Sequence, residues 1–183
     1  MGETVGMTTL RTAVCASAVT LALLASAAPA QAVVEPAGEQ AASTGVPGLR
    51  ADWQERMLVQ LNAVRTRAGS PPVRMCVALT RSAEAYASEL SRDDRFSHTG
   101  SDGRNVIQRI AASGYRPVLV GENLAAGQPT VAQAVGDWRR SLSHYATMTD
   151  PRFRHVGFGY QQGRSPKYAT FWVQHFGSGG PCG

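Results

Sequence analysis

Apolar residues at helical spacing predict helices in the first two thirds of the chain. From Asp52 they recur every three or four positions up to Ala68, and Gly69 followed by two prolines ends the segment. Asp52 and Glu55 have the spacing of an N-terminal capping box. The same period predicts three further helices, from about Leu79 to Asp94, from Val106 to Ala111, and from Thr130 through Trp138.

Three segments show strand patterns. The segment from Tyr115 to Val120 is β-branched and contains proline, which favours an edge strand leading into Gly121-Glu122-Asn123. Two more strands, His155 to Gln161 and Tyr168 to Phe176, are separated by turn residues at 162–166. Helices followed by strands with a short connection indicate a layered α+β domain and not a parallel α/β sheet.

The first 32 residues have the pattern of a secretory signal peptide. Arg11 precedes an uncharged run from Ala13 to Ala28, and small residues then recur with A-x-A spacing. We expect cleavage after Ala32, with Ala28 and Ala30 as alternative positions, and therefore a secreted, extracellular protein. An uncleaved membrane anchor is the other interpretation, although the apolar run is short for a bilayer.

The rest of the chain is predicted to form a leader and one domain. Residues 33–50 mix Pro, Gly, Ala and Ser without an apolar period, which predicts a flexible leader before a domain at 51–183. No segment after the signal peptide is long and apolar enough to cross a membrane. With 183 residues, 43% of them hydrophobic and 17% charged, the chain has material for one packed core, and wholesale disorder is excluded.

The basic charge does not indicate nucleic acid. The chain has 18 Lys and Arg against 13 Asp and Glu, a net charge of +5, and Lys167 is its one lysine. The arginines are scattered, without a run, a stripe or an aromatic-interleaved motif. Such a charge permits loose association with an anionic component of the cell envelope, and it is equally compatible with a solvated surface.

Cysteine usage points to one bridge. Removal of the signal peptide leaves Cys76 and Cys182, and two cysteines in an exported protein most simply form a disulfide. The bridge would hold the C-terminus against the domain and stabilise it by up to about 4 to 5 kcal/mol in the chain-entropy model. Two free thiols are the alternative.

Recognised catalytic motifs are missing. The sequence has no H-E-x-x-H, Walker loop, G-x-S-x-G elbow or C-x-x-C. The candidates for chemistry are four histidines and one carboxylate, namely His98, Glu122, His144, His155 and His175. Two imidazoles and a carboxylate can hold a divalent cation such as Zn²⁺, but the sequence separations fix no local geometry. His155 and His175 lie in apolar strand patterns, so we expect them to be structural.

A series of motifs then carries a family resemblance. It begins with Asn62-x-x-Arg65 and F-S-H-T-G-S-D-G at 96–103, and it continues through G-E-N-L-A at 121–125 and W-x-x-S-x-x-H at 138–144. It ends with H-V-G-F-G-Y at 155–160 and W-V-Q-H-F-G at 172–177. From about residue 53 to residue 177 the chain resembles the CAP superfamily, also called the SCP domain. This superfamily includes cysteine-rich secretory proteins, antigen 5 and pathogenesis-related 1 proteins, and the bacterial secreted branch fits best.

The resemblance implies a fold and a cleft. The fold is an α-β-α sandwich with an antiparallel sheet between helices. In the family, two histidines and two acidic residues line the cleft. His98, Glu122 and His144 match three of these positions, and the second acid falls on Ser141. A metal, if bound, would be held by His98 and His144, with a site less negative than the family's.

Three functions are consistent with these observations. We expect an extracellular binding or interaction module, for a lipid-like ligand or a cell-envelope partner, and not an enzyme. The alternative is a metal- or serine-dependent hydrolase that uses the same cleft, with Ser141 or Ser143 inviting a Ser-His-Glu arrangement. The third is a wall-binding protein that acts through charge alone and has no cleft chemistry.

Overall fold

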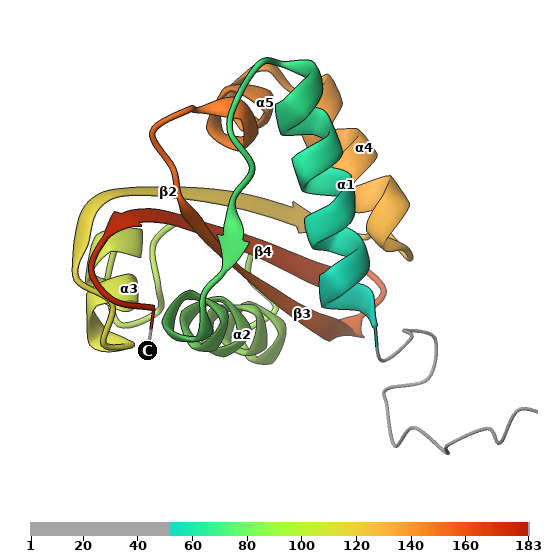
Figure 1. The fold of residues 1–183 in the computed structure, drawn as a ribbon. Coiled ribbons are helices and arrows are strands. Elements are labelled where there is room, and N and C mark those ends of the chain that lie inside the picture. The colour runs from blue at the N-terminus through green and yellow to red at the C-terminus, as the bar shows by residue number, and fades with distance from the viewer. Residues whose placement is uncertain (1–51, 183) are drawn as a thin grey trace, which may run out of the picture. The chain divides into compact units, whose positions relative to one another are not determined.

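A computed structural model describes residues 52–182, so the expected signal peptide and leader lie outside the described residues. The described part contains five helices and four strands (Figure 1). In chain order these are α1 (Trp53–Arg67), β1 (Arg74–Met75), α2 (Val77–Arg92), α3 (Val106–Ala112), β2 (Pro117–Ala126), α4 (Val131–Arg140), α5 (Leu142–Thr149), β3 (His155–Ser165) and β4 (Tyr168–Gly179).

The four strands form one sheet in the order β1-β3-β4-β2. Strand β4 runs antiparallel to both β3 and β2, as the sequence predicts. The two-residue β1, which the sequence pattern does not reveal, pairs in parallel with β3, so the sheet is mixed. Strand β2 lies at an edge, where the proline at its start costs no ladder hydrogen bond.

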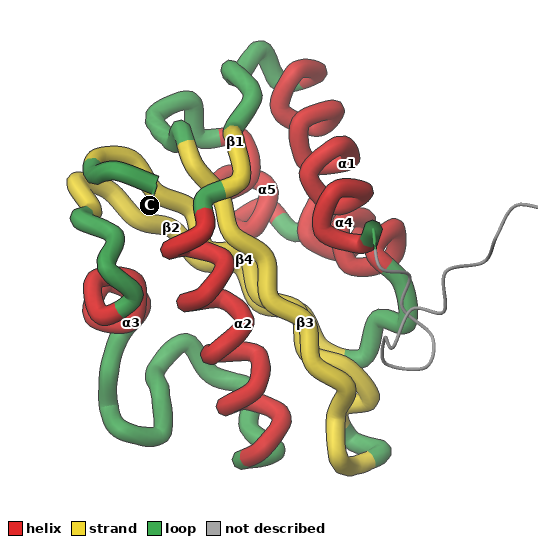
Figure 2. Tube along the Cα trace, turned by 60° about the horizontal axis from the view of Figure 1, so that its bottom comes forward, coloured by secondary structure: helices red, strands yellow, loops and turns green. Residues whose placement is uncertain are grey.

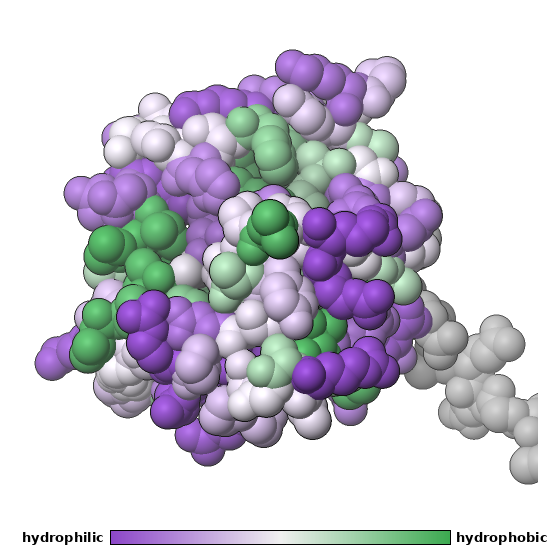
Figure 3. Space-filling model, turned by 90° about the horizontal axis from the view of Figure 1, so that it is seen from above, coloured by the Kyte–Doolittle hydropathy of each residue, from purple (hydrophilic) through white to green (hydrophobic). Residues whose placement is uncertain are grey.

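Helices cover both faces of the sheet. Figure 1 shows α1, α4 and α5 above it and α2 and α3 below it, and the turned view of Figure 2 agrees. This is the predicted α-β-α sandwich. The largest apolar cluster lies under α1 and α4 and includes Met57, Leu61, Trp138 and Trp172. Seen from outside, this upper layer is mostly hydrophilic, and its apolar residues form separate patches (Figure 3).

Helix ends show which local signals act. Helix α1 begins where predicted, but the Asp52 side chain makes no capping hydrogen bond, so the predicted capping box is wrong there. The helix ends at Arg67, and Gly69 takes a left-handed conformation with φ +75°. Helix α3 instead carries a complete capping box, in which Asn105 and Gln108 exchange hydrogen bonds.

Several element boundaries differ from the sequence prediction, and one helix was not predicted. Helix α2 begins at Val77 and ends at Arg92, two residues earlier than expected at both ends. Strand β2 runs through Glu122 to Ala126 instead of stopping at Val120, because ladder partners on β4 hold this polar stretch in extended form. Helix α5 was not predicted, since its eight residues are too few to show a clear period.

Two glycines bring α2 directly against β3. A Cβ at Gly157 would lie 2.1 Å from the Leu79 carbonyl carbon, and one at Gly159 would lie 2.0 Å from the Ala83 oxygen. No larger residue fits at either position without moving the helix. This close approach sets how far Tyr86, one turn further along α2, lies from the sheet.

The C-terminal end is tied to the start of α2. Cys76, the residue before α2, forms a disulfide with Cys182, with their Cα atoms 4.9 Å apart. Of the two interpretations open to the sequence, the disulfide is therefore correct. Within the described residues, no helix is long and apolar enough to cross a membrane.

Candidate functional site

The candidate site is built around one buried carboxylate on the edge strand. Glu122 on β2 pairs with His175 on β4, and paired residues of neighbouring strands project to the same face. His175 Nε2 lies 2.8 Å from Glu122 Oε2. The Glu122 side chain is 2% exposed and the His175 side chain 0% exposed. His175 is therefore a buried residue, as expected, and it is also a direct partner of the carboxylate.

A buried arginine completes the shell of Glu122. Arg109 on α3 donates from Nη2 to Glu122 Oε2 at 2.7 Å and to the His98 carbonyl at 3.1 Å. Its Nη1 donates to the Arg104 carbonyl at 2.7 Å. The guanidinium also stacks on the Tyr86 ring, 3.5 Å from its centroid, which is a favourable cation–π geometry. Together these contacts fix the position of the Arg109 guanidinium.

His98 reaches the carboxylate from the loop between α2 and α3. Its Nδ1 lies 2.6 Å from Glu122 Oε1, and 61% of its side chain is exposed. Its loop is organised by Tyr86, whose hydroxyl donates to the Ser97 carbonyl, and by Arg95, which donates to the Thr99 carbonyl at 2.7 Å. Glu122 thus holds one edge of an imidazole whose other edge is open to solvent.

The pKa shifts follow from these contacts. Burial alone would raise the pKa of Glu122, but hydrogen bonds from His175 and His98, together with the Arg109 charge, lower it to about 2. The hydrogen bond to Glu122 raises the pKa of His98. Complete burial lowers the pKa of His175, so its ring is neutral and Nε2–H donates to the carboxylate. Glu122 is therefore ionised at neutral pH and has no proton to donate.

His144 approaches from the opposite layer, on α5. The side-chain amide of Asn123, the residue after Glu122, donates to the His144 carbonyl at 3.1 Å and to Gln174 Oε1 at 3.1 Å. Burial lowers the pKa of His144, and the nearby charge of His98 lowers it further. Both effects favour the neutral form of the His144 ring. Within residues 52–182, the His144 ring makes no hydrogen bond.

Ser141 does not assemble a serine triad with His144. It is the residue before α5, where its side chain makes no capping hydrogen bond, and its hydroxyl lies 3.2 Å from the Ser143 hydroxyl. Neither serine is hydrogen-bonded to His144 in the described part of the chain. The geometry that a nucleophilic serine needs, with the base within hydrogen-bond reach, is not formed between these residues.

A groove adjoins His144 and Ser141. It encloses about 340 Å³ and is lined mainly by apolar side chains, among them Phe96, Leu124, Trp138 and Tyr168. Phe96 and Tyr168 form a ring pair with centroids 5.9 Å apart, and Phe96 is 44% exposed. Polar atoms of Gln128, Asp137, Ser141 and His144 complete the rim. His98 and Glu122 lie outside this groove.

The side chains do not fit a resident zinc ion. A Zn²⁺ site uses at least three protein ligands, and no group of three or more His, Cys, Asp or Glu suited to a metal occurs among residues 52–182. Both oxygens of Glu122 are already occupied by His98, His175 and Arg109. The expected ligand pair, His98 and His144, therefore has no third metal ligand beside it in the described part of the chain.

Sequence reasoning missed Arg109 and the role of Tyr86. Arg109 is one of seventeen arginines, and nothing in its neighbourhood distinguishes it from the exposed ones. Its burial, at 7% exposure, is the only signal, and that appears only in the fold. His155 lies apart from this cluster, with Nδ1 2.9 Å from the Tyr115 hydroxyl, in the structural role predicted for it.

Comparisons with known proteins agree with this fold. Residues 58–176 match the model of the cysteine-rich secretory protein (CAP) family. The uncharacterized protein YkwD of Bacillus subtilis (strain 168) is 27% identical over 134 residues, 73% of this chain and 50% of YkwD. The chain thus spans about half the length of the curated relative it matches.

Solved structures show the same architecture. An extracellular SCP-domain protein from Bacillus anthracis strain Ames superposes with a TM-score of 0.62 at 21% identity, over 69% of this chain and 40% of that one. An outer surface protein from Borrelia burgdorferi gives a TM-score of 0.59 at 21% identity, over 68% of this chain and 90% of that one. At these identities the likeness concerns the fold.

Proposed function

The chain belongs to the cysteine-rich secretory protein (CAP) family, and on this premise we propose that it is a secreted binding module. Its ligand would lie at the free edge of β2, between His98 and His144, and extend along the groove beside Phe96 and Tyr168. The signal-peptide pattern of residues 1–32 supports export. Two structural relatives, one described as extracellular and one as an outer surface protein, are in line with it.

One observation carries the choice of binding over acid–base catalysis by the carboxylate, namely that both oxygens of Glu122 are already engaged. Oε1 contacts His98, and Oε2 contacts both Arg109 and His175. A general acid or base needs an oxygen that can reach the substrate, and its pKa should lie near the working pH. Glu122 meets neither condition, so its role is to orient His98 and to hold a proton on Nδ1.

The groove supports an amphiphilic, lipid-like ligand. Imidazole nitrogens of His98 and His144 are available for the polar end of such a molecule, because within residues 52–182 the His98 ring contacts Glu122 through Nδ1 alone and the His144 ring makes no hydrogen bond. The apolar walls formed by Leu124, Trp138 and the Phe96–Tyr168 ring pair suit a hydrocarbon portion. A volume of about 340 Å³ lies within the usual range of ligand pockets.

Displacement of a fluorescent fatty acid from the full chain tests this proposal. Phe96→Asp places a charge on the groove wall and should weaken fatty-acid binding by about tenfold or more, since a charge beside a hydrocarbon is costly. Val118→Asp is the matched control, because Val118 is 86% exposed and does not line the groove. Equal affinities in the two variants, or no binding to the unmodified chain, would overturn the proposal.

The same protein preparations test the hydrolase alternative. Ester or peptide hydrolysis that disappears in both His98→Ala and His144→Ala, with folding intact by circular dichroism, would favour an enzyme. Ester or peptide hydrolysis that persists in both variants would come from outside this cleft.

A further inference from the structure

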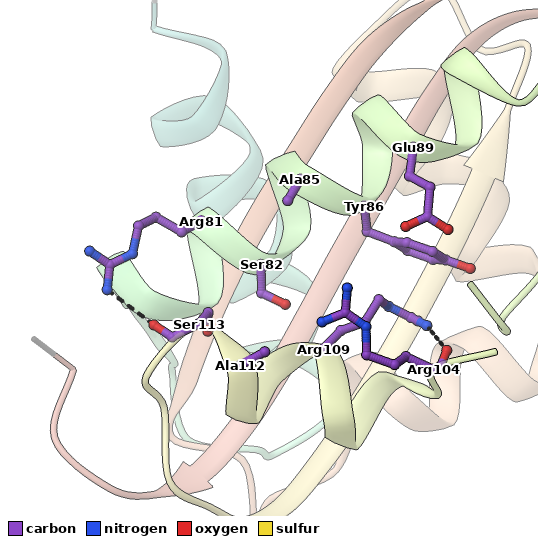
Figure 4. A pocket seen from close by; sticks show the side chains of 9 residues that line it. All are labelled: Arg81, Ser82, Ala85, Tyr86, Glu89, Arg104, Arg109, Ala112 and Ser113. Carbon is purple, nitrogen blue, oxygen red and sulfur yellow. Dashed lines mark hydrogen bonds between the residues drawn. The ribbon is translucent and has the colours of Figure 1, made fainter. Parts of the chain in front are cut away.

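A second cavity lies on the other side of the sheet, between α2 and α3. It encloses about 440 Å³ and is drawn in Figure 4. Arg81, Ser82 and Glu89 line it from α2, and Arg104 and Arg109 line it from α3 and the residues before it. None of these side chains lines the groove beside His144, so this cavity is a separate site.

Two deeply buried polar side chains here have an atom without a partner. Ser82 is 4% exposed and Arg109 7% exposed, yet Ser82 Oγ and Arg109 Nε make no hydrogen bond within the described structure. In Figure 4 the Ser82 hydroxyl points from α2 toward α3. An unpaired buried donor costs about 1 to 3 kcal/mol, so proteins rarely leave two together unless something else satisfies them.

The surrounding arginines add further free donors. Arg104 donates from Nε to Asp102 at 2.5 Å, and its two terminal nitrogens make no hydrogen bond among residues 52–182. Arg81 donates from Nη2 to the Ser113 carbonyl at 3.1 Å and forms no ion pair in the described structure. On the acceptor side, Glu89 Oε1 already receives the Ser101 amide at 2.7 Å. The free groups of the cavity are therefore mostly donors.

A cavity rich in free donors and arginine suits an oxyanion. Guanidinium groups match the geometry of phosphate oxygens, and a phosphate offers several acceptors at once. The charges of Arg109 and Arg104 are balanced by Glu122 and Asp102, and the two remaining charges of the lining, Arg81 and Glu89, form no ion pair in the described part of the chain. Ala85 and Ala112 on facing helices, with the Tyr86 ring, leave an apolar margin for a small organic group.

We propose that the cavity between α2 and α3 is a binding site for a phosphate group, either free or as a monoester on a small molecule. Arg81, Ser82 and Arg104 bind the phosphate oxygens directly. Arg109 forms the floor of the site and keeps its other edge on Glu122. The site does not rest on the function proposed for the cleft, since no residue that lines this cavity also lines the groove beside His144.

Calorimetric titration of the full chain with inorganic phosphate, and separately with glycerol phosphate, tests the site. Arg81→Gln and Arg104→Gln should each weaken phosphate binding by about tenfold, the typical effect of one charge-assisted hydrogen bond. Arg139→Gln removes the same charge from an exposed position on α4 and should leave binding unchanged. Vesicles of phosphatidylglycerol test whether the bound phosphate belongs to a lipid headgroup, because only the vesicles present a phosphate group in a membrane.

Ser82→Ala gives a second readout that a merely structural role would not produce. Without phosphate, the variant should be as stable as the unmodified chain or more stable, because a buried unpaired hydroxyl is removed. With phosphate, its melting temperature should rise less than that of the unmodified chain.

The outcomes separate clearly. Binding that Arg81→Gln and Arg104→Gln weaken and Arg139→Gln does not would support the site, and vesicle binding with the same pattern would identify the headgroup as its source. Equal binding by all three variants would show that surface charge alone is responsible and would overturn the proposal. Failure of both phosphate and glycerol phosphate to bind at millimolar concentration would also overturn it.

Discussion

Arg65 and Arg109 are both buried arginines, one in each helical layer, and they differ in how their nitrogens are used. Arg65, at the end of α1, donates to the carbonyls of Pro71, Met148, Asp150 and Phe153, so that every side-chain nitrogen has a partner. Arg109 contacts a carboxylate and an aromatic ring, and its Nε is left without a partner beside a cavity in the described structure.

The contrast indicates what each of the two arginines does. Arg65 links α1 to α5 and to the loop before β3, and its hydrogen bonds are made to backbone carbonyls of the protein. Such a side chain holds the fold together and has nothing left to offer a ligand. Around Arg109, by contrast, some polar groups can still bind a ligand. On one side the His98 side chain is 61% exposed, and on the other side Ser82 Oγ and Arg109 Nε make no hydrogen bond within the described structure. We therefore place both proposed ligands beside this cluster.

The largest effect is expected from Arg65→Met. The change leaves four buried or half-buried carbonyls without their donor and should lower the free energy of unfolding by about 4 kcal/mol. Chemical denaturation measures it. Arg67→Met, at the exposed end of the same helix, should change that free energy by less than about 0.5 kcal/mol. If both variants lose the same stability, Arg65 does not stabilise the fold by linking α1 to α5.

The loss of stability at acidic pH tests the contacts of Glu122 with Arg109 and the two histidines. Because the pKa of Glu122 falls from 4.5 to about 2 on folding, its ionised form stabilises the protein above pH 4.5, and this contribution is lost as pH falls toward 2. The contribution is about 3 kcal/mol. In Glu122→Gln it is absent, so the stability difference from the unmodified chain should be greatest near neutral pH and shrink in acid. Denaturation at a series of pH values measures the difference.

Glu55→Gln serves as the control for this experiment. Glu55 is an exposed carboxylate in the first turn of α1, and its replacement should leave the loss of stability at acidic pH unchanged. His98 acts in the opposite sense to Glu122, since its raised pKa gives stability that is present in mild acid and lost as pH rises through the folded-state pKa. If the free energies of unfolding of Glu122→Gln and of the unmodified chain change with pH in parallel, ionised Glu122 does not stabilise the folded protein.

The smallest effect concerns the two cleft histidines. The charge of His98 contributes to the lowered pKa of His144, after burial. His98→Gln should therefore raise the pKa of His144 toward its ordinary value, without restoring it completely, because burial still acts. Titration of the histidine resonances by NMR measures the shift. An unchanged pKa of His144 would mean that the two rings do not share one cleft.

Secondary structure was predicted well wherever local signals were strong. Helix α1 starts and ends where the apolar period and Gly69 place it, and α4 begins at the predicted Thr130, whose hydroxyl accepts from the Gln133 amide at 3.3 Å. Prediction failed for β1 and α5, which have two and eight residues. Elements this short depend on their partners, and their own residues show no period.

The ingredients of the site were also visible in the sequence, whereas their relations were not. His98, Glu122 and His144 stood out as chemical groups, and the motifs around them indicated the family. That His98 contacts Glu122 depends on the loop before α3, and Glu122 meets Arg109 and His175 from positions 13 and 53 residues away. The ligand-binding roles of His98, Glu122, His144 and Ser141 stay predictions.

The amino-acid sequence alone determined the layered class, the export pattern, the main helices and the family, because periodicity, composition and short motifs act over a few residues. Only the tertiary structure decided which of seventeen arginines is buried against Glu122 and which buried donors of the described residues lack a partner. Burial and pairing depend on the path of the whole backbone, here on two glycines that let α2 lie against β3. Contacts of this kind leave no local trace in the sequence.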